Sequence, residues 1–307
     1  MADTATPVDA GTAASESRGR FAATIVLGHA LKHIYLSAFS TVLIPEIKLG
    51  LGLTATQVGS LASVQQFSGW GSTMASGYLG DRFLNKTGVM LAVSLSIMGI
   101  AYFFVGLADS YTVLLVAMLF VGIGPSLYHA PALGSLSRRF ADRRALVISM
   151  HGAGGSLGEV LGPLIGAGLI AVLVWQDVLR LSIVPALVVA FVMWRLLRKE
   201  SASHAHQGTS SLRAYLGSFY ALLGQRALLL ICLVSACRSV GQSTTAIFLP
   251  IYMREDLGYS AGLVGLYLSM AQLAGVGSQP LMGFLCDRLG HKLVLAPALA
   301  AFASCFS

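Results

Sequence analysis

Residues 77–86 read GYLGDRFLNK, and 206 residues later residues 283–292 read GFLCDRLGHK. The same offset extends upstream, where it pairs Gly52 with Gly258 and Thr54 with Ser260. Each copy ends a long apolar segment in small residues and then turns through a compact charged loop. That pattern is typical of two tightly packed membrane helices joined at a polar surface. The sequence therefore predicts two halves built on one plan.

The composition indicates an integral membrane protein. Hydrophobic residues make up 55% of the 307-residue chain, charged residues only 11%, and the mean hydropathy is +0.75, which leaves too little polarity for a water-facing surface. The sequence has no metal-ligand spacing, nucleotide-binding loop or nucleophile elbow. We therefore expect neither an enzyme nor a metal or cofactor. The cysteines lie in or beside apolar segments and are interpreted as packing residues: Cys232, Cys237, Cys286 and Cys305.

Nine apolar segments predict an all-α membrane fold, since nearly all reach the ~20 residues that a spanning helix needs. We expect residues 1–20 to form a disordered cytoplasmic tail, 21–198 a six-helix bundle, 199–225 a cytoplasmic linker with an amphipathic helix, and 226–307 three spans of a second bundle. The repeat offset implies roughly 100 further residues for a complete second half, so we expect either a truncated gene product or part of a longer chain. The segments lie at about 22–46, 56–80, 88–107, 111–137, 145–173, 178–198, 227–252, 259–285 and 292–307.

The net charge of +7 is interpreted as a consequence of membrane topology, because basic residues gather in the cytoplasmic loops. With the N-terminus inside the cell, 15 of the 20 Lys and Arg residues are cytoplasmic, and only Lys48, Arg180 and Arg254 lie outside. Basic loops face the cytoplasm in membrane proteins. We therefore expect a multi-pass protein of the inner (plasma) membrane with a cytoplasmic N-terminus, in contact with lipid and not with nucleic acid.

The doubled loop resembles the loop motif of the major facilitator superfamily, and the resemblance covers essentially every residue after about Phe21. It implies that the aspartate of each loop lies against a helix N-terminus of the other half, while the arginine holds cytoplasmic carboxylates. Such a latch could break and re-form as the halves move. The alternative is a solvated loop that serves only membrane insertion. The second copy departs from the first in having Cys286 where Gly80 stands. The residues given this gating role are Gly77, Asp81, Arg82, Lys86, Gly283, Asp287 and Arg288.

The predicted fifth span carries a glycine at every fourth position, which forms a smooth strip for a neighbouring helix. It resembles the G-x-x-x-G-P-x-x-G motif of proton-coupled antiporters in the superfamily, with Ala167 in place of a usual glycine. This resemblance implies a gating interface and export. The alternative is ordinary tight packing. The strip comprises Gly154, Gly158, Gly162 and Gly166, with Pro163 adding a bend.

The predicted fourth span contains Tyr128 and His129, and with the fifth span it resembles efflux proteins of the fosmidomycin-resistance type, although Ala130 intervenes before Pro131. His129 is a candidate proton-handling or substrate-facing group, or else a packing residue that donates to a carbonyl.

Ionisable residues inside membrane spans are costly and are therefore functional candidates. His29, Lys32 and His33 share one helix face by their i, i+3, i+4 spacing. Glu159, deep in its span, is a candidate proton carrier if unpaired, and a structural ion pair with Lys32 or another cation is the alternative. His33 and His151 are further proton-coupling candidates.

Lys32 and Arg238 are equivalent under the repeat and are predicted near the membrane midplane. Two cations at one depth would repel each other unless an anion or a carboxylate lay between them. The arrangement is similar to that of the superfamily's organophosphate exchangers, in which one cation from each half clamps a phosphate. The alternative is that Lys32 pairs internally and Arg238 caps a helix. The predicted substrate-binding residues are Lys32, Arg238, His29, Tyr35, Tyr128, His129 and Gln242.

The leading prediction is thus a secondary transporter that works by alternating access, a proton-coupled efflux antiporter of a small, anionic drug or metabolite. We expect it to act as a monomer. Two alternatives stay open: organic-anion or organophosphate uptake or exchange, and a membrane sensor or scaffold that does not transport.

Overall fold

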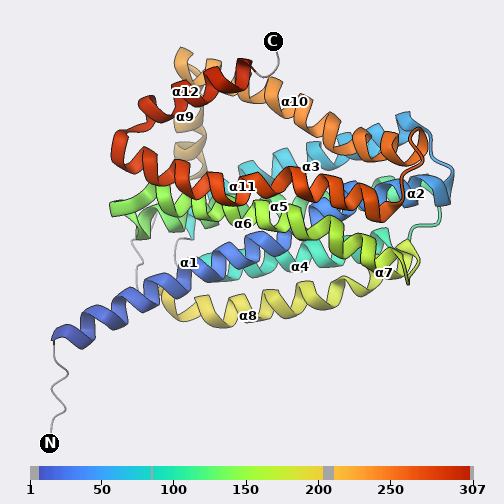
Figure 1. The fold of residues 1–307 in the computed structure, drawn as a ribbon. Coiled ribbons are helices and arrows are strands. Elements are labelled where there is room, and N and C mark those ends of the chain that lie inside the picture. Colours follow the sequence, from blue (N-terminus) through green and yellow to red (C-terminus); the bar gives the residue numbers. More distant parts are fainter. Residues whose placement is uncertain (1–6, 84–85, 203–210, 305–307) are drawn as a thin grey trace, which may run out of the picture.

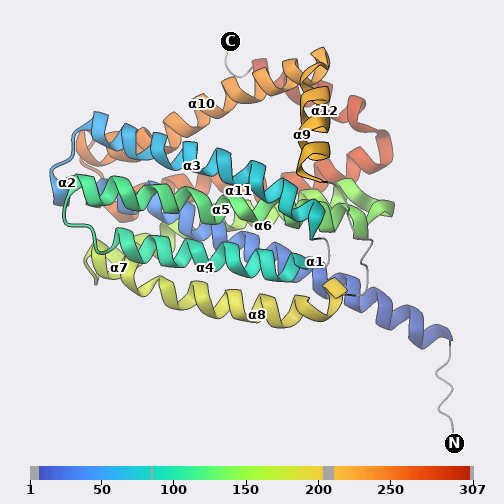
Figure 2. The same ribbon diagram turned by 180° about the vertical axis from the view of Figure 1, so that it is seen from behind.

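The computed structural model describes residues 7–83, 86–202 and 211–304, and these residues form helices that lie mostly side by side (Figure 1, Figure 2). The first half contains α1 (Pro7–Ala38), a π-helical turn at Phe39–Leu43, α2 (Ile44–Leu51), α3 (Ala55–Arg82), α4 (Thr87–Val105), α5 (Tyr111–Arg139), a 3-10 turn at Ala141–Arg143, α6 (Arg144–Ile170), α7 (Trp175–Leu181) and α8 (Ile183–Ala202). The remainder contains α9 (Leu212–Leu223), α10 (Arg226–Glu255), α11 (Ala261–Leu289) and α12 (His291–Ser304).

The repeated residues upstream of the two loops end and start helices. Gly52 and Gly258 both have positive φ angles, of 63° and 68°, a conformation that glycine adopts without strain. Two residues later a hydroxyl caps the next helix: Thr54 accepts from the Gln57 backbone N–H at 3.2 Å, and Ser260 accepts from that of Leu263 at 3.2 Å. The internal repeat therefore appears as equivalent helix starts, at Ala55 for α3 and at Ala261 for α11.

We expected residues 1–20 to form a disordered tail, whereas in the structure α1 begins at Pro7. Arg18 fixes this extension by donating to Asp142 at 2.7 Å and to the Arg139 carbonyl at 3.0 Å. The Arg139 guanidinium also lies 4.4 Å from the ring centre of the buried Phe21. Alanine-rich sequence propagates a helix once a membrane span has nucleated it. Residues 1–6 lie outside the described part.

Seven of the nine predicted spans fall in helical segments that are long and apolar enough to cross a membrane, as judged over the described residues. The two others are α3, which has 28 residues but contains many polar side chains, and α12, which is described over 14 residues. In the first half α3 packs on α5, α4 packs on α5 and α8, and α1 packs on α6. The core of that half includes the fully buried side chains of Leu91, Leu95, Met98 and Leu114.

A helix forms in the predicted linker, where Ser211 caps α9 by accepting from the Ala214 backbone N–H at 3.2 Å. Helix α11 packs along α6 of the first half, whereas α10 approaches α2 and α3 at one end and diverges from them toward the end that holds α9 and α12 (Figure 1, Figure 2). The two halves thus meet mainly through α6 and α11.

Candidate functional site

Six ionisable side chains that the sequence singled out gather between α1, α5 and α6, and we call them the polar cluster. Five ring contacts join its histidines; in the closest, the rings of His29 and His151 are nearly parallel and their centroids are 3.7 Å apart. The cluster comprises His29, Lys32 and His33 on α1, His129 on α5, and His151 and Glu159 on α6.

A chain of hydrogen bonds runs through the polar cluster into the second half. The Nδ1 of His29 lies 2.7 Å from the His151 carbonyl, and its Nε2 lies 3.1 Å from the Nε2 of His33. The other nitrogen of His33 lies 3.1 Å from Oε1 of Glu159. The second carboxylate oxygen accepts from Gln272 of α11 at 2.8 Å. Glu159 is therefore the point at which the cluster contacts the second half.

Lys32 lies inside the cluster without a carboxylate partner among the described residues. Its side chain is 2% exposed, and its Nζ lies 2.5 Å from Nε2 of His129. Neither ring nitrogen of His151 has a hydrogen-bond partner in the part of the chain that the structure describes, although both are buried. The cluster thus holds one buried lysine amine and two ring nitrogens without a described partner.

Three other predicted substrate residues lie apart from the cluster's charged groups. Arg238 is exposed and donates to Gln242 one turn along its own helix at 2.9 Å, so no described contact joins it to Lys32. Tyr35 donates its hydroxyl to the Ser182 carbonyl, which ties α1 to the start of α8. Spacing in the sequence gave the depth of these residues but not the direction of their side chains.

Tyr128 is fully buried and donates to the Ile25 carbonyl at 2.7 Å. Its ring stacks at 5.9 Å from His29 and 6.3 Å from His151, so it forms one wall of the polar cluster. A side chain at Gly28 would collide with its hydroxyl and with Met193. Tyr128 therefore supports the cluster's rings through packing.

The glycine strip of α6 packs against α1, within the first half. A Cβ at Gly158 would collide with the Ala30 carbonyl, and one at Gly154 would lie 2.9 Å from the Val26 carbonyl oxygen. Gly162 similarly meets Ser37, and Gly166 meets Ala38 and Val42. The strip brings α1 close enough for its histidines to reach α6. It is not a contact between the halves.

The contact between the halves uses another face of α6 that sequence reasoning missed. Ser269 donates to the Val160 carbonyl at 2.7 Å, and Gln279 donates to Ser156 at 2.8 Å. A Cβ at Gly265 would lie 3.0 Å from the carbonyl oxygen of Pro163. The signal was available in the sequence, since small and amide residues recur every three or four positions along α11: Gly265, Ser269, Gln272, Gly275, Gln279 and Gly283.

The second charged loop forms the predicted contact across the halves. Both carboxylate oxygens of Asp287 accept from the N-terminus of α6, at 3.1 Å from Ala145 N and 2.7 Å from Leu146 N. A carboxylate there satisfies free backbone N–H groups and the helix dipole. A Cβ at Gly283 would collide with Ser149, so this glycine permits the close approach. Arg288 lies over the ring of Phe284 at 4.5 Å, not against a carboxylate among the described residues.

The first charged loop is not arranged in the same way. Asp81 is exposed, and Arg82 donates to the Tyr78 hydroxyl on its own helix at 3.3 Å. Lys86 lies 5.2 Å from the ring centre of Phe83. Gly77 faces the linker helix, where a Cβ would lie 2.8 Å from the Tyr215 hydroxyl. The two similar loop motifs thus make different contacts. Among the described elements, a helix N-terminus lies opposite the second loop, at Asp287, and not opposite the first.

At the opposite end of the bundle, two ion pairs join the halves. Arg254 pairs with Glu46 at 2.5 Å, and Lys48 pairs with Glu255 at 2.5 Å. The four side chains are between 15% and 31% exposed, so these pairs are partly shielded from water. They close that end of the interface between α2 and α10.

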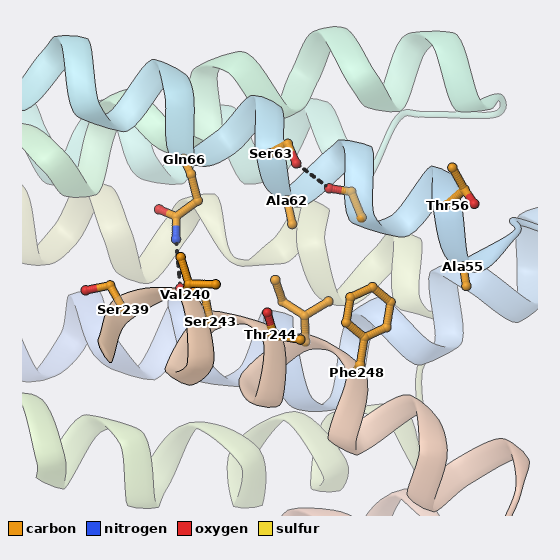
Figure 3. A pocket seen from close by; sticks show the side chains of 12 residues that line it. Ala55, Thr56, Ala62, Ser63, Gln66, Ser239, Val240, Ser243, Thr244 and Phe248 are labelled. Carbon is orange, nitrogen blue, oxygen red and sulfur yellow. Dashed lines mark hydrogen bonds between the residues drawn. The ribbon is translucent and has the colours of Figure 1, made fainter. Parts of the chain in front are cut away.

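A cavity of about 750 Å³ lies between α3 and α10 (Figure 3). Gln66 donates to Ser243 across it at 3.2 Å, and Phe248 closes one side. Its lining is small, hydroxyl-bearing or apolar and contains no ionisable side chain, so the charged chemistry is in the polar cluster. The cavity is lined by Ala55, Thr56, Gly59, Ala62, Ser63, Gln66, Ser239, Val240, Ser243, Thr244, Ile247 and Phe248.

No metal-ligating residues were expected from the sequence, yet the fold brings three histidines close enough together to hold a metal ion. The ligand atoms of His29, His33 and His129 lie within 4.8 Å of one another. Spacing rules failed because the third histidine comes from a helix about one hundred positions along the chain.

Comparison with known proteins decides the family. A sequence profile of the Major Facilitator Superfamily matches residues 25–307. The chain belongs to this superfamily. It is a multi-pass membrane transporter, and its relatives are efflux proteins and other transporters.

Similar transporters cover most of the chain at low identity. The fosmidomycin resistance protein of Escherichia coli is 22% identical over 96% of this chain and 72% of its own length. The agnestins efflux protein of Paecilomyces divaricatus is 22% identical over 79% of this chain and 54% of its own length. A crystal structure of a bacterial homologue of the human lysosomal transporter Spinster, inward-facing and unoccupied, superposes with a TM-score of 0.69 at 19% identity, over 89% of this chain and 63% of that one. The chain therefore spans between about half and three quarters of these transporters.

Proposed function

We propose that the chain carries the transport site of a proton-coupled efflux antiporter that works by alternating access on a small, anionic substrate. The protein would lie in the plasma membrane with its N-terminus in the cytoplasm and would act as a monomer. The observation that carries the proposal is the position of Glu159, which accepts from Gln272 of the second half and contacts His33 of the first.

This position couples the charge of Glu159 to the contact between the halves. A hydrogen bond to a charged acceptor contributes roughly 1 kcal/mol more than one to a neutral acceptor. Protonation of Glu159 therefore weakens its bond to Gln272 by about that amount, which shifts an equilibrium between closed and open halves about fivefold. The side chain is 28% exposed, so a proton has access to it.

Lys32 supports an anionic substrate. A buried ammonium is stable only with a negative partner or strong hydrogen bonds, and His129 supplies a single neutral acceptor in the described structure. His33 and His129 are partly exposed, so they lie between Lys32 and the accessible side of the cluster. A substrate anion that reached these rings would gain attraction from the ammonium behind them.

Alternating access has a candidate gate at each end of the bundle. Asp287 on the α6 N-terminus closes one end, and the pairs of Glu46 with Arg254 and Lys48 with Glu255 close the other. All of these contacts join the two halves and consist of charges that water can solvate once they separate. The names of the relatives favour export, since one is a resistance protein and another an efflux protein.

The experiment is transport by the full-length gene product in vesicles with an imposed pH gradient. Anionic probes such as an alkylphosphonate are compared with cationic probes of similar size. We expect export of the anion driven by inward proton movement, and external pH changes recorded by a dye. Uptake in the direction of the proton gradient would favour the uptake alternative, and no flux of any probe would favour the sensor or scaffold.

A further inference from the structure

Three histidine rings of the polar cluster lie close together in an arrangement that proton transfer through Glu159 does not require. His29 and His33 are one turn apart on α1, and the ring of His129 approaches from α5, with centroids 5.0 Å from His29 and 6.5 Å from His33. The three rings belong to two packed helices of the same half. Their arrangement is therefore independent of how the halves move.

Both α1 histidines are held in one tautomer by oxygen atoms. The Nδ1 of His29 lies 2.7 Å from the His151 carbonyl, which can only accept, so this nitrogen carries the proton. The Nδ1 of His33 lies 3.1 Å from the Glu159 carboxylate, which as an anion also accepts. In that state both Nε2 atoms are unprotonated, and they face each other at 3.1 Å. Two lone pairs at this distance repel unless a cation lies between them.

A metal ion fits these constraints. Zinc binds imidazole nitrogen at about 2.0–2.1 Å, so two ligand nitrogens of a tetrahedral site lie about 3.3 Å apart. The pair of Nε2 atoms is already within a few tenths of an ångström of this value. Oxygen acceptors on the outer nitrogens of metal-binding histidines fix the ring orientation in such sites. Gly155 leaves room for both rings, because a Cβ there would lie 2.9 Å from Cε1 of His29.

We propose that His29, His33 and His129 bind a divalent transition-metal ion of the zinc class, in place of the proton that the two Nε2 atoms otherwise share. Three imidazoles select Zn²⁺, Co²⁺, Ni²⁺ or Cu²⁺ over Mg²⁺ and Ca²⁺, which prefer oxygen. His129 completes the site by moving its ligand nitrogen inward by at most about 1.5 Å, because the three ligand atoms already lie within 4.8 Å of one another. A fourth position stays open for water or an anion.

The side chain of Lys32 is expected to weaken binding of the ion. Its removal should therefore strengthen ion binding, a result that a purely structural role of the histidines would not produce. Its ammonium occupies Nε2 of His129 at 2.5 Å and adds a positive charge beside the site. Removing it both frees the third ligand and removes the repulsion. The Lys32→Met variant is therefore expected to bind the ion more tightly, by at least about tenfold.

The experiment titrates the purified, chelator-stripped full-length protein with Co²⁺, whose absorption reports tetrahedral coordination, and with Zn²⁺ in competition. We expect one ion per chain, loss of binding in His33→Ala and His129→Ala, and a 10–100-fold weakening in Glu159→Gln, which loses a ligand-orienting charge. His291→Ala, an exposed histidine at the start of α12, serves as the control and should bind as the unmodified protein does.

Unchanged binding in both His33→Ala and His129→Ala, or absence of saturable binding in the unmodified protein, would overturn the proposal. If either alanine variant fails to fold, the Lys32→Met variant still tests the proposed metal site. Weaker ion binding by Lys32→Met than by the unmodified protein would also overturn the proposal. The readout is ion binding and not flux, so a negative result leaves the proposed transport function untouched.

Discussion

Gly158→Ala tests how the site is assembled, because this glycine sets the distance between α1 and α6. The added Cβ would collide with the Ala30 carbonyl oxygen and would lie 2.7 Å from the Cβ of His33 and 3.0 Å from the Ile34 nitrogen. Two of these atoms are backbone and cannot rotate away. The helices must therefore separate by about 1 Å to restore ordinary contact distances.

Overpacking of this kind costs about 1–3 kcal/mol. In a domain of 150–250 residues each kcal/mol lowers Tm by about 2–4 °C, so the expected loss is about 2–12 °C. Gly168→Ala is the matched control on the same helix, because nothing lies within 4 Å of the Cβ that it adds. That substitution gains helix propensity of up to about 1 kcal/mol.

The assay is thermal unfolding of both purified variants in one detergent, together with transport by each. We expect Gly158→Ala to lose stability and transport together, since the displaced α1 carries His33 away from Glu159, while Gly168→Ala keeps both. Equal Tm values for the two variants would refute the packing of α1 on this strip. Normal stability with lost transport would instead indicate that the strip gates the halves.

Substitutions at three charged contacts test the ends of the bundle and the anion site. Asp287→Asn should weaken the cap of α6 by about 0.5–2 kcal/mol and open that end of the bundle, seen as faster labelling of an engineered cysteine there, while Asp81→Asn should change labelling little. Arg254→Gln should open the opposite end, and the double variant with Glu46→Gln should be no more open than the single one, since the pair is already broken; additive effects would argue against the pair. Lys32→Gln should remove transport of anionic probes and spare cationic ones in vesicle assays, and retained anion flux would exclude an anion site at Lys32.

The fold was largely predictable, because short stretches of sequence determine the positions of its helices. Apolar length identifies membrane spans, and the doubled loop identifies two halves in which α3 and α11 start at equivalent positions, after Gly52 and Gly258. The helical extension at residues 7–20 was not predictable, since it depends on the contact of Arg18 with Asp142, far along the chain. Polar composition alone argued for disorder there.

The candidate site was predictable only in part. Membrane burial of charge pointed to Lys32 and Glu159, and helical spacing placed His29 with His33, because these are properties of one helix at a time. These properties of a single helix do not predict which residues of other helices a side chain contacts. Gln272 was missed because an amide in a span carries no charge signal, and the predicted approach of Arg238 to Lys32 rested on symmetry, which fixes depth but not side-chain direction.

The central claim is that Glu159 couples proton movement to the contact between the halves, and Glu159→Gln tests it most directly. The amide keeps the size of the side chain and an acceptor for Gln272 but cannot carry a proton. In vesicles, this variant is expected to exchange substrate across the membrane without a gradient and to give no response to an imposed pH gradient. Transport driven by the pH gradient at the unmodified rate in Glu159→Gln would contradict it.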